Sequence, residues 1–250
     1  DWSSDVCSSD LRIGDEEGNF SHLAIVGQDD KGQLYAVESL IQKGVVVTPL
    51  EEWRKMKDPR VALFRFKDTE LANKAAREAY QWGLKHAEYD FAMDDFNYDK
   101  AFCSEVVKYA YDKASGGKVM LPMYRSHVTK FKGGPYPATL GVTRSTLFAP
   151  YDIEVDPRFE FVAEGRYYPL LRQVRMQDSV LQSVYSWMIE KDYTFYETPW
   201  INTQALLGKS IRYIGFIQDQ IPSYMPLETL RTVIQFQTRS EEHTSELQSH

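Results

Sequence analysis

Two short apolar runs near the start of the 250-residue chain restrict what it can fold into. SHLAIVG occupies residues 21–27 and LYAVESL residues 34–40, with QDDKGQ between them. Aspartates and a glycine between two such runs are typical of a β-hairpin turn. The chain is therefore predicted to build part of its core on antiparallel strands.

The next segment, GVVVTPLEEW at 44–53, predicts a strand that runs directly into a helix. Thr48 is expected to be the N-cap of this helix, and Pro49 suits its first position. Glu51 would then complete a capping box with Thr48.

Further strands and helices alternate along the chain. VALFRF at 61–66 predicts a strand, and Asp68 is expected to cap a helix over 69–85. Apolar residues recur at helical spacing in that helix: Leu71, Ala75, Ala79 and Trp82. FCSEVVKYAYDKAS at 102–115 predicts a second helix, which the glycine pair 116–117 ends.

The sequence changes character towards its C-terminal end. GGPYPATLG at 133–141 is predicted to be a loop and FEFVAEG at 159–165 a strand. From about residue 176 the segments QDSVLQSVYSWMIEK and SYMPLETLRTVIQFQ look helical. The predicted fold class is α+β: a small antiparallel sheet packed with helices, followed by a mostly helical C-terminal segment over 176–238.

The two ends of the chain are related to each other through their DNA. A coding sequence for DWSSDVCSSDL (1–11), read on the opposite strand, encodes RSEEHTSELQS (239–249). The shared sequence looks like a sequencing-library adapter, and such segments are left out of fold reasoning. We therefore assign 1–11 and 239–250 to adapter and expect a domain over 12–175 that is truncated at its amino-terminal end.

Setting the two ends aside changes the composition. The formal net charge of −7 falls to about −2, because the ends are strongly acidic. A chain with so little charge is not expected to bind nucleic acid or an acidic membrane. One cysteine remains, Cys103, which excludes an internal disulfide framework and a cysteine-rich zinc site. The sequence also lacks an apolar run of about 18 residues, so no transmembrane segment is predicted.

The lone cysteine lies in the first turn of the predicted helix at 102–115. It shares a stripe with apolar residues expected to face the interior: Val106, Val107, Ala110, Tyr111 and Ala114. A free cysteine on such a stripe is often a small buried hydrophobic residue. The unpaired N–H groups and the dipole of a first helical turn nevertheless favour a thiolate. From these residues alone, Cys103 is either a core residue or a nucleophile.

His22 is the candidate base, although a lone histidine at a strand start is more often structural. A turn centred on Asp30 would place His22 opposite Glu38, with Cβ atoms roughly 4.5–5.5 Å apart. The carboxylate could then hold one ring nitrogen and leave the other to act as base. A turn centred half a residue later would pair His22 with Ser39 and put Glu38 on the other face. A glycine bulge at Gly32 could restore the first pairing.

Metal and phosphate chemistry find little support in the sequence. Asp95, Asn97 and Asp99 have the alternate spacing of a calcium loop. However, Lys100 stands where the glycine belongs and Val106 where the bidentate glutamate belongs. The remaining histidines have no zinc-binding spacing, and GGPYPATLG lacks the lysine and the following helix of a phosphate loop. We therefore expect neither a metal nor another cofactor.

The order of the motifs resembles one known family. SHLAIVG, LYAVES, GVVVTPLEEW, a strand, a helix, AEYDFAMDD and AFCSEVVKYAY follow one another as in the permuted papain-like amidases. These YiiX/YaeF-type cysteine hydrolases are relatives of the NlpC-type cell-wall peptidases, and in them histidine precedes cysteine along the chain. The resemblance covers about residues 20 to 125 and depends on the motifs taken together. It implies that 12–175 is a hydrolase domain with a circularly permuted papain-like fold.

Carried over residue by residue, the resemblance makes Cys103 the nucleophile, His22 the general base and Glu38 the acid that orients it. Tyr89 of EYD matches a recurring family tyrosine and is expected near the substrate. Glu105 of CSE also matches, at a position where it could serve the fold alone. The family's early glycine–aspartate strand has no counterpart here.

The resemblance implies a cysteine-dependent hydrolase of amide bonds, in cell-wall peptides or lipid-linked amides, that forms an acyl-enzyme. Two alternatives stay open. One is a thiol-dependent lipid acyltransferase or thioesterase, and the other is a non-catalytic binding module on a papain-like scaffold. The resemblance favours the bacterial cell envelope or periplasm.

Overall fold

The computed structural model describes residues 20, 22–56, 58–93, 98–122, 124–125, 146–172 and 174–175, and the single residues 191, 203, 227 and 230. The predicted loop at 133–141 lies outside these residues. The predicted helical segment at 176–238 also lies outside them, apart from the four single residues.

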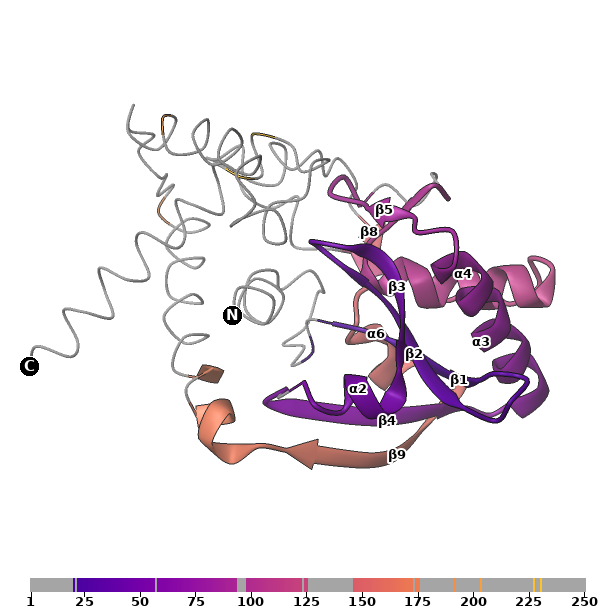
Figure 1. Ribbon diagram of the computed structural model, residues 1–250, viewed down its shortest axis with the longest axis horizontal. Coiled ribbons are helices and arrows are strands. Elements are labelled where there is room, and N and C mark those ends of the chain that lie inside the picture. Colours follow the sequence, from indigo (N-terminus) through magenta and orange to yellow (C-terminus); the bar gives the residue numbers. More distant parts are fainter. Residues whose placement is uncertain are drawn as a thin grey trace, which may run out of the picture.

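A three-stranded antiparallel sheet in the order β1–β2–β3 carries the first part of the chain (Figure 1). β1 spans Ile25–Gln28, β2 spans Leu34–Leu40 and β3 spans Gly44–Pro49. β2 lies in the middle and pairs with both neighbours. The predicted hairpin is therefore confirmed, although β1 starts later than the apolar run suggested.

The turn between β1 and β2 contains the glycine bulge that the sequence allowed. The Gly32 N–H donates to the Asp29 carbonyl at 3.0 Å, and the Asp29 N–H donates to the Gln33 carbonyl at 2.9 Å. Gly32 has a φ of +80°, in the left-handed region that favours glycine. This three-residue loop puts Ile25 opposite Val37, so the turn is centred one residue later than Asp30.

The junction after β3 differs from the prediction. Thr48 and Pro49 are still paired with β2, so the short helix α2 (Leu50–Trp53) has Pro49 as its N-cap. No described side chain caps this helix, and Glu51 contacts Arg54 at 3.5 Å instead. The predicted Thr48 cap is wrong because Pro49, which it needs as the first helical residue, is also paired with β2 and has an extended ψ of 132°.

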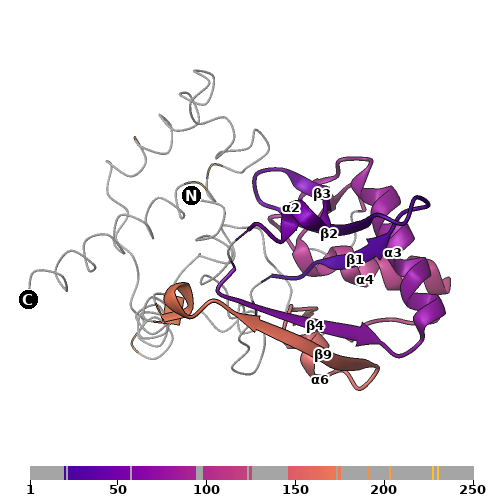
Figure 2. The ribbon, with the colours of Figure 1, turned by 60° about the horizontal axis from the view of Figure 1, so that its bottom comes forward.

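Two longer helices, α3 (Thr69–Gly83) and α4 (Cys103–Ser115), contact each other on one side of the sheet (Figure 1 and Figure 2). Asp68 caps α3 by accepting the Leu71 N–H at 3.0 Å, and Gly116 ends α4 with a φ of +63°. Both ends are as predicted. The predicted helix stripes pack with the sheet in one core that includes Val37, Val45, Ala75, Ala79, Trp82, Val106, Val107, Ala110 and Tyr111.

A second antiparallel pair consists of β4 (Arg60–Phe66) and β9 (Phe159–Arg166), which lie side by side in both views (Figure 2). Both strands were predicted. The Phe66 ring packs against the rings of Tyr111 and Phe159 at 4.7 and 5.0 Å between centroids. This aromatic cluster joins the β4–β9 pair to α4.

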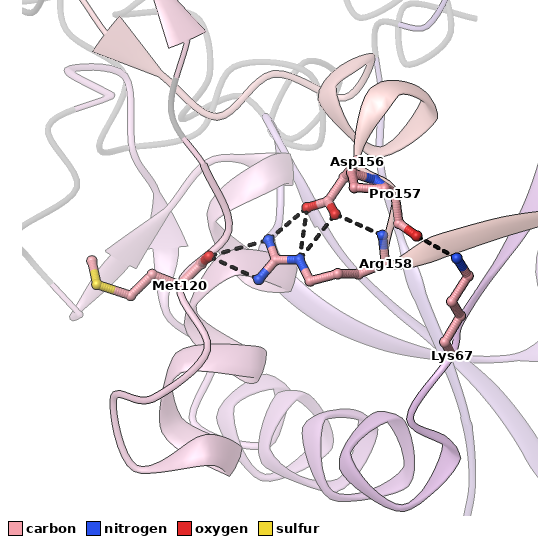
Figure 3. Close-up of polar contacts among 5 residues, drawn as sticks. All are labelled: Lys67, Met120, Asp156, Pro157 and Arg158. Carbon is pink, nitrogen blue, oxygen red and sulfur yellow. Dashed lines mark hydrogen bonds and ion pairs between the residues drawn. The ribbon is translucent and has the colours of Figure 1, made fainter.

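A polar clamp at the start of β9 joins the pair to the loop after α4 (Figure 3). It follows the single-turn helix α6 (Asp152–Val155). The Arg158 guanidinium donates to both carboxylate oxygens of Asp156 and to the Met120 carbonyl. Lys67 donates to the Pro157 carbonyl at 2.6 Å.

The remaining strands are two residues long. β5 (Glu88–Tyr89) and β6 (Lys100–Ala101) pair in parallel, and β7 (Tyr124–Arg125) pairs antiparallel with β8 (Thr146–Leu147). Small sheets, mostly antiparallel, packed with helices make the described part an α+β fold, as predicted.

Candidate active site

Cys103 is the first residue of α4, and only Phe102 separates it from the short strand β6. Phe102 precedes it in extended conformation and is only 1% exposed, which anchors the helix start in the core. The Glu105 carboxylate accepts the Phe102 N–H at 3.0 Å, so Glu105 caps the helix from within. Cys103 itself is 7% exposed and is a free thiol. The predicted first-turn position is confirmed.

His22 and Glu38 are in direct contact. The Nε2–H of His22 donates to Glu38 Oε2 at 2.7 Å. Glu38 is almost completely buried, whereas the His22 side chain is 24% exposed. A buried carboxylate in this position fixes the ring orientation and leaves Nδ1 as the nitrogen available to another group.

The predicted register between these two residues needs a correction. They are not directly opposite each other, because the pairing of Ile25 with Val37, continued by one residue, puts Glu38 across from Ala24. His22 therefore reaches Glu38 diagonally along the same face of the hairpin. The turn with the bulge at Gly32 is centred on Lys31 and not on Asp30, so the pairing slides by two positions and both side chains stay on one face.

The Cys103 thiol lies close enough to His22 for the imidazole to lower its pKa, which brings all three candidate residues together. Burial raises the pKa of the Cys103 thiol, but the neighbouring imidazole of His22 and its charge outweigh this effect. The Ser104 hydroxyl, 3.8 Å from the sulfur, and a hydrogen bond from the Leu23 backbone act in the same direction. The pKa of Cys103 is therefore below its ordinary value, which favours the thiolate.

Tyr89 lies beside the chain that enters α4. It is 7% exposed, its ring packs on Phe91 with 5.0 Å between centroids, and its backbone pairs with Ala101. These contacts connect Tyr89 to the site through the β5–β6 backbone. A direct contact between Tyr89 and the substrate stays a prediction.

Three polar residues near the site were not found from the sequence. Ser104 is fully buried beside the sulfur, and Ser39 is fully buried next to Glu38 in the sequence. Partial burial raises the pKa of Asp58, with His22 lowering it and Glu38 raising it, so Asp58 lies within electrostatic reach of both. Ser104 could have been found from its place after Cys103. Asp58 carries no local signal, since only the fold brings it near His22.

Papain-like cysteine hydrolases work with a thiol, an imidazole and a hydrogen-bonding partner of the imidazole, in whichever order the chain supplies them. Residues 8–130 match the model of one family: permuted papain-like amidase enzyme, YaeF/YiiX, C92 family. The chain belongs to this family, and the protein is an enzyme of the cysteine peptidase or amidase class. The match includes residues 8–11, which we assign to adapter, so the predicted domain bounds stay a prediction.

No curated protein and no solved structure matches the chain. In the part of the chain that the structure describes, none of the helices is both long and apolar enough to cross a membrane. Among the same residues, no three His, Cys, Asp or Glu side chains are grouped so that they could hold a metal ion.

Proposed function

We propose that the protein hydrolyses amide bonds with Cys103 as nucleophile, His22 as general base and acid, and Glu38 as the residue that orients His22. One observation carries the proposal: a continuous set of contacts runs from the buried Glu38 carboxylate through His22 to the Cys103 thiol. Each member has the environment that its role requires, including a lowered pKa at the nucleophile. We assign the permuted, NlpC-type topology on the chain order, in which His22 and Glu38 precede Cys103.

The reaction has two halves. The Cys103 thiol gives its proton to His22, and the sulfur attacks the carbonyl carbon of the amide. The backbone N–H of Cys103, unpaired within the helix at its start, would stabilise the negative oxygen of the tetrahedral intermediate. The C–N bond then breaks and His22 passes its proton to the leaving amine, which yields the acyl-enzyme. A water molecule, deprotonated by His22, releases the acid and restores the thiol.

The family implies a peptide-type amide as substrate. We propose two chemical classes within it, cell-wall peptides and lipid-linked amides. They differ in the acyl part, which carries amino acids in the first and a hydrocarbon chain in the second.

The test is hydrolysis of two sets of fluorogenic coumarin amides, one with peptidyl and one with fatty-acyl groups, by the full chain and by Cys103→Ala. We expect the rate on any cleaved amide to fall by at least about a thousandfold in the variant. Mass spectrometry of the quenched reaction should find the acyl group on Cys103. Equal hydrolysis by both proteins would contradict the proposal.

The acyltransferase and thioesterase alternatives use the same nucleophile. A thioesterase would cleave thioesters and leave both sets of amides intact, and a transferase is recognised by its acyl acceptor. Added amines or alcohols would capture the acyl group in a transferase, whereas the free acid dominates in a hydrolase. The third alternative, a binding module without turnover, is set aside because the family consists of enzymes.

A further inference from the structure

β2 carries two adjacent polar residues that are almost completely buried. Glu38 is 2% exposed and Ser39 is 0% exposed. Successive side chains of a strand point to opposite faces of the sheet. The two residues therefore serve different sides of β2, although one peptide bond joins them.

Ser39 faces the helix side of the sheet. It lies opposite Val45 in β3, and Val37 and Val45 both belong to the core shared with α3 and α4. Glu38 consequently faces the other side, where it accepts the hydrogen bond from His22 at 2.7 Å.

The Ser39 hydroxyl reaches the chain that leads into the nucleophile helix. Its Oγ–H donates to the Ala101 carbonyl at 2.6 Å, across 62 positions in the sequence. Ala101 is the last residue of β6 and is fully buried, and Phe102 and Cys103 follow directly. The Ser39 hydroxyl thus connects β2, which carries Glu38, to β6, which leads into Cys103.

The backbone hydrogen bonds that link β2 to β6 follow a longer route than the Ser39–Ala101 bond. The Val45 N–H donates to the Ala87 carbonyl at 2.8 Å, and Tyr89 of β5 then pairs with Ala101. This route passes through two further elements before it reaches Ala101. The Ser39 hydroxyl, by contrast, bonds directly to Ala101, and Ser39 is the residue next to Glu38.

We propose that Ser39 is a positioning residue, whose hydroxyl sets the spacing between the His22–Glu38 pair and the start of α4. With the bond in place, the Cys103 thiol lies close enough to the imidazole for His22 to lower its pKa. Without it, β6 and the helix start can move relative to β2. This inference rests on the proposed function, because it assumes that His22 activates Cys103.

A purely structural role for Ser39 predicts something different. In that case the hydroxyl only satisfies a buried carbonyl, and its loss lowers stability without changing the chemistry of the thiol. The two roles are separated by the reactivity of Cys103 in protein that is still folded.

The experiment measures the rate of Cys103 alkylation by iodoacetamide as a function of pH, with peptide mass spectrometry to distinguish Cys103 from Cys7. The variants are Ser39→Thr and Ser39→Val, which have nearly the same shape and differ in the hydroxyl group. Tyr35→Phe is the matched control, since the Tyr35 hydroxyl also donates from β2 to a buried carbonyl, that of Ala76 at 3.1 Å. That bond leads to α3 and not to the nucleophile.

We expect Ser39→Val to alkylate roughly tenfold more slowly than Ser39→Thr at about pH 6, with a profile moved towards that of an ordinary thiol. Ser39→Thr and Tyr35→Phe should keep the wild-type profile. On a cleaved amide, Ser39→Val should lower kcat and leave KM nearly unchanged. If the valine variant does not fold, Ser39→Ala removes the hydroxyl without added volume and gives the same comparison.

Identical profiles for Ser39→Val, or for Ser39→Ala, and the wild type would overturn the inference, and so would an equal change in Tyr35→Phe. Failure of the proposed function looks different. In that case the wild-type thiol itself would alkylate like an ordinary cysteine, before any change at Ser39.

Discussion

The sheet with its two helices and the β4–β9 pair use polar side chains in opposite ways. Around the site, Glu38, Ser39, Ser104 and Glu105 are each at most 7% exposed. On the β4–β9 pair, Arg65 contacts Glu160 at 3.9 Å, with both side chains more than half exposed. Buried polar groups are costly to leave without partners, so their bonds restrict geometry. Exposed ion pairs contribute about 1 kcal/mol or less.

This difference predicts which region should be sensitive to substitution and which should tolerate it. These four buried polar residues lie on β2 and α4, the elements that supply Glu38 and Cys103. The β4–β9 pair contributes apolar packing through Phe66 and Phe159, and the Arg65–Glu160 ion pair on it lies at the surface. Substitutions of one kind should therefore have unequal effects in the two regions.

The largest contrast is expected between two glutamates. Glu38→Gln should lower kcat on a cleaved amide by roughly 10²–10⁴-fold, because the imidazole loses the charge that fixes its tautomer and stabilises its cation. Glu164→Gln removes a carboxylate bound by Arg60 and Arg166 on the β4–β9 pair and should leave kcat unchanged. Steady-state kinetics on both variants decides this, and equal losses would break the comparison.

Replacing each of two glycines by alanine should have very different effects on the stability of the protein. Gly44 has a φ of +68°, and a Cβ there would lie 2.0 Å from the Ala87 carbonyl oxygen. Gly44→Ala should therefore cost more than about 3 kcal/mol or prevent folding. In β9, a Cβ on Gly165 would meet nothing described within 4 Å, so Gly165→Ala should change stability by less than about 0.5 kcal/mol. Urea unfolding of both variants measures the contrast.

The clamp at the start of β9 is the place where the β4–β9 pair should behave like the site region. Burial raises the pKa of Asp156, but its hydrogen bonds with Arg158 outweigh this and hold the pKa below its ordinary value of 3.8. A lowered pKa stabilises the fold above the ordinary value, and this contribution is lost as the pH falls through the lowered one. Arg158→Met should cost about 1–3 kcal/mol at pH 7.

The pH dependence sharpens this prediction. The difference in free energy of unfolding between the wild type and Arg158→Met should shrink below about pH 3.8, as Asp156 becomes protonated in both. Urea unfolding at pH 7 and at pH 3 measures it. A difference that does not depend on pH would mean that the Met120 carbonyl, and not Asp156, is the important partner of Arg158.

Local patterns made much of the fold predictable. The Asp68 cap, the helix stripes and the glycine after Ser115 depend on neighbours within a few residues, and the structure has them as predicted. The position of Cys103 at a helix start follows from the same pattern. The Thr48 cap failed because pairing with a distant strand outweighed a local preference.

Contacts between distant segments were not predictable in the same way. The pairing of β1 with β2 depended on whether Gly32 forms a bulge, and a shift of one residue decides which side chains share a face. The bond from Ser39 to Ala101 spans 62 positions and has no periodic signal. Asp58 approaches His22 only through the placement of the segment before β4.

The most direct test of the central claim is the pH profile of Cys103 alkylation in the wild type and in His22→Gln. The claim is that His22 holds Cys103 partly as a thiolate at neutral pH. The wild type should therefore react rapidly at about pH 6, and the variant only above about pH 8.5, because burial raises the pKa of the thiol once His22 is replaced. Superimposable profiles would contradict the claim and return Cys103 to the role of a buried core residue.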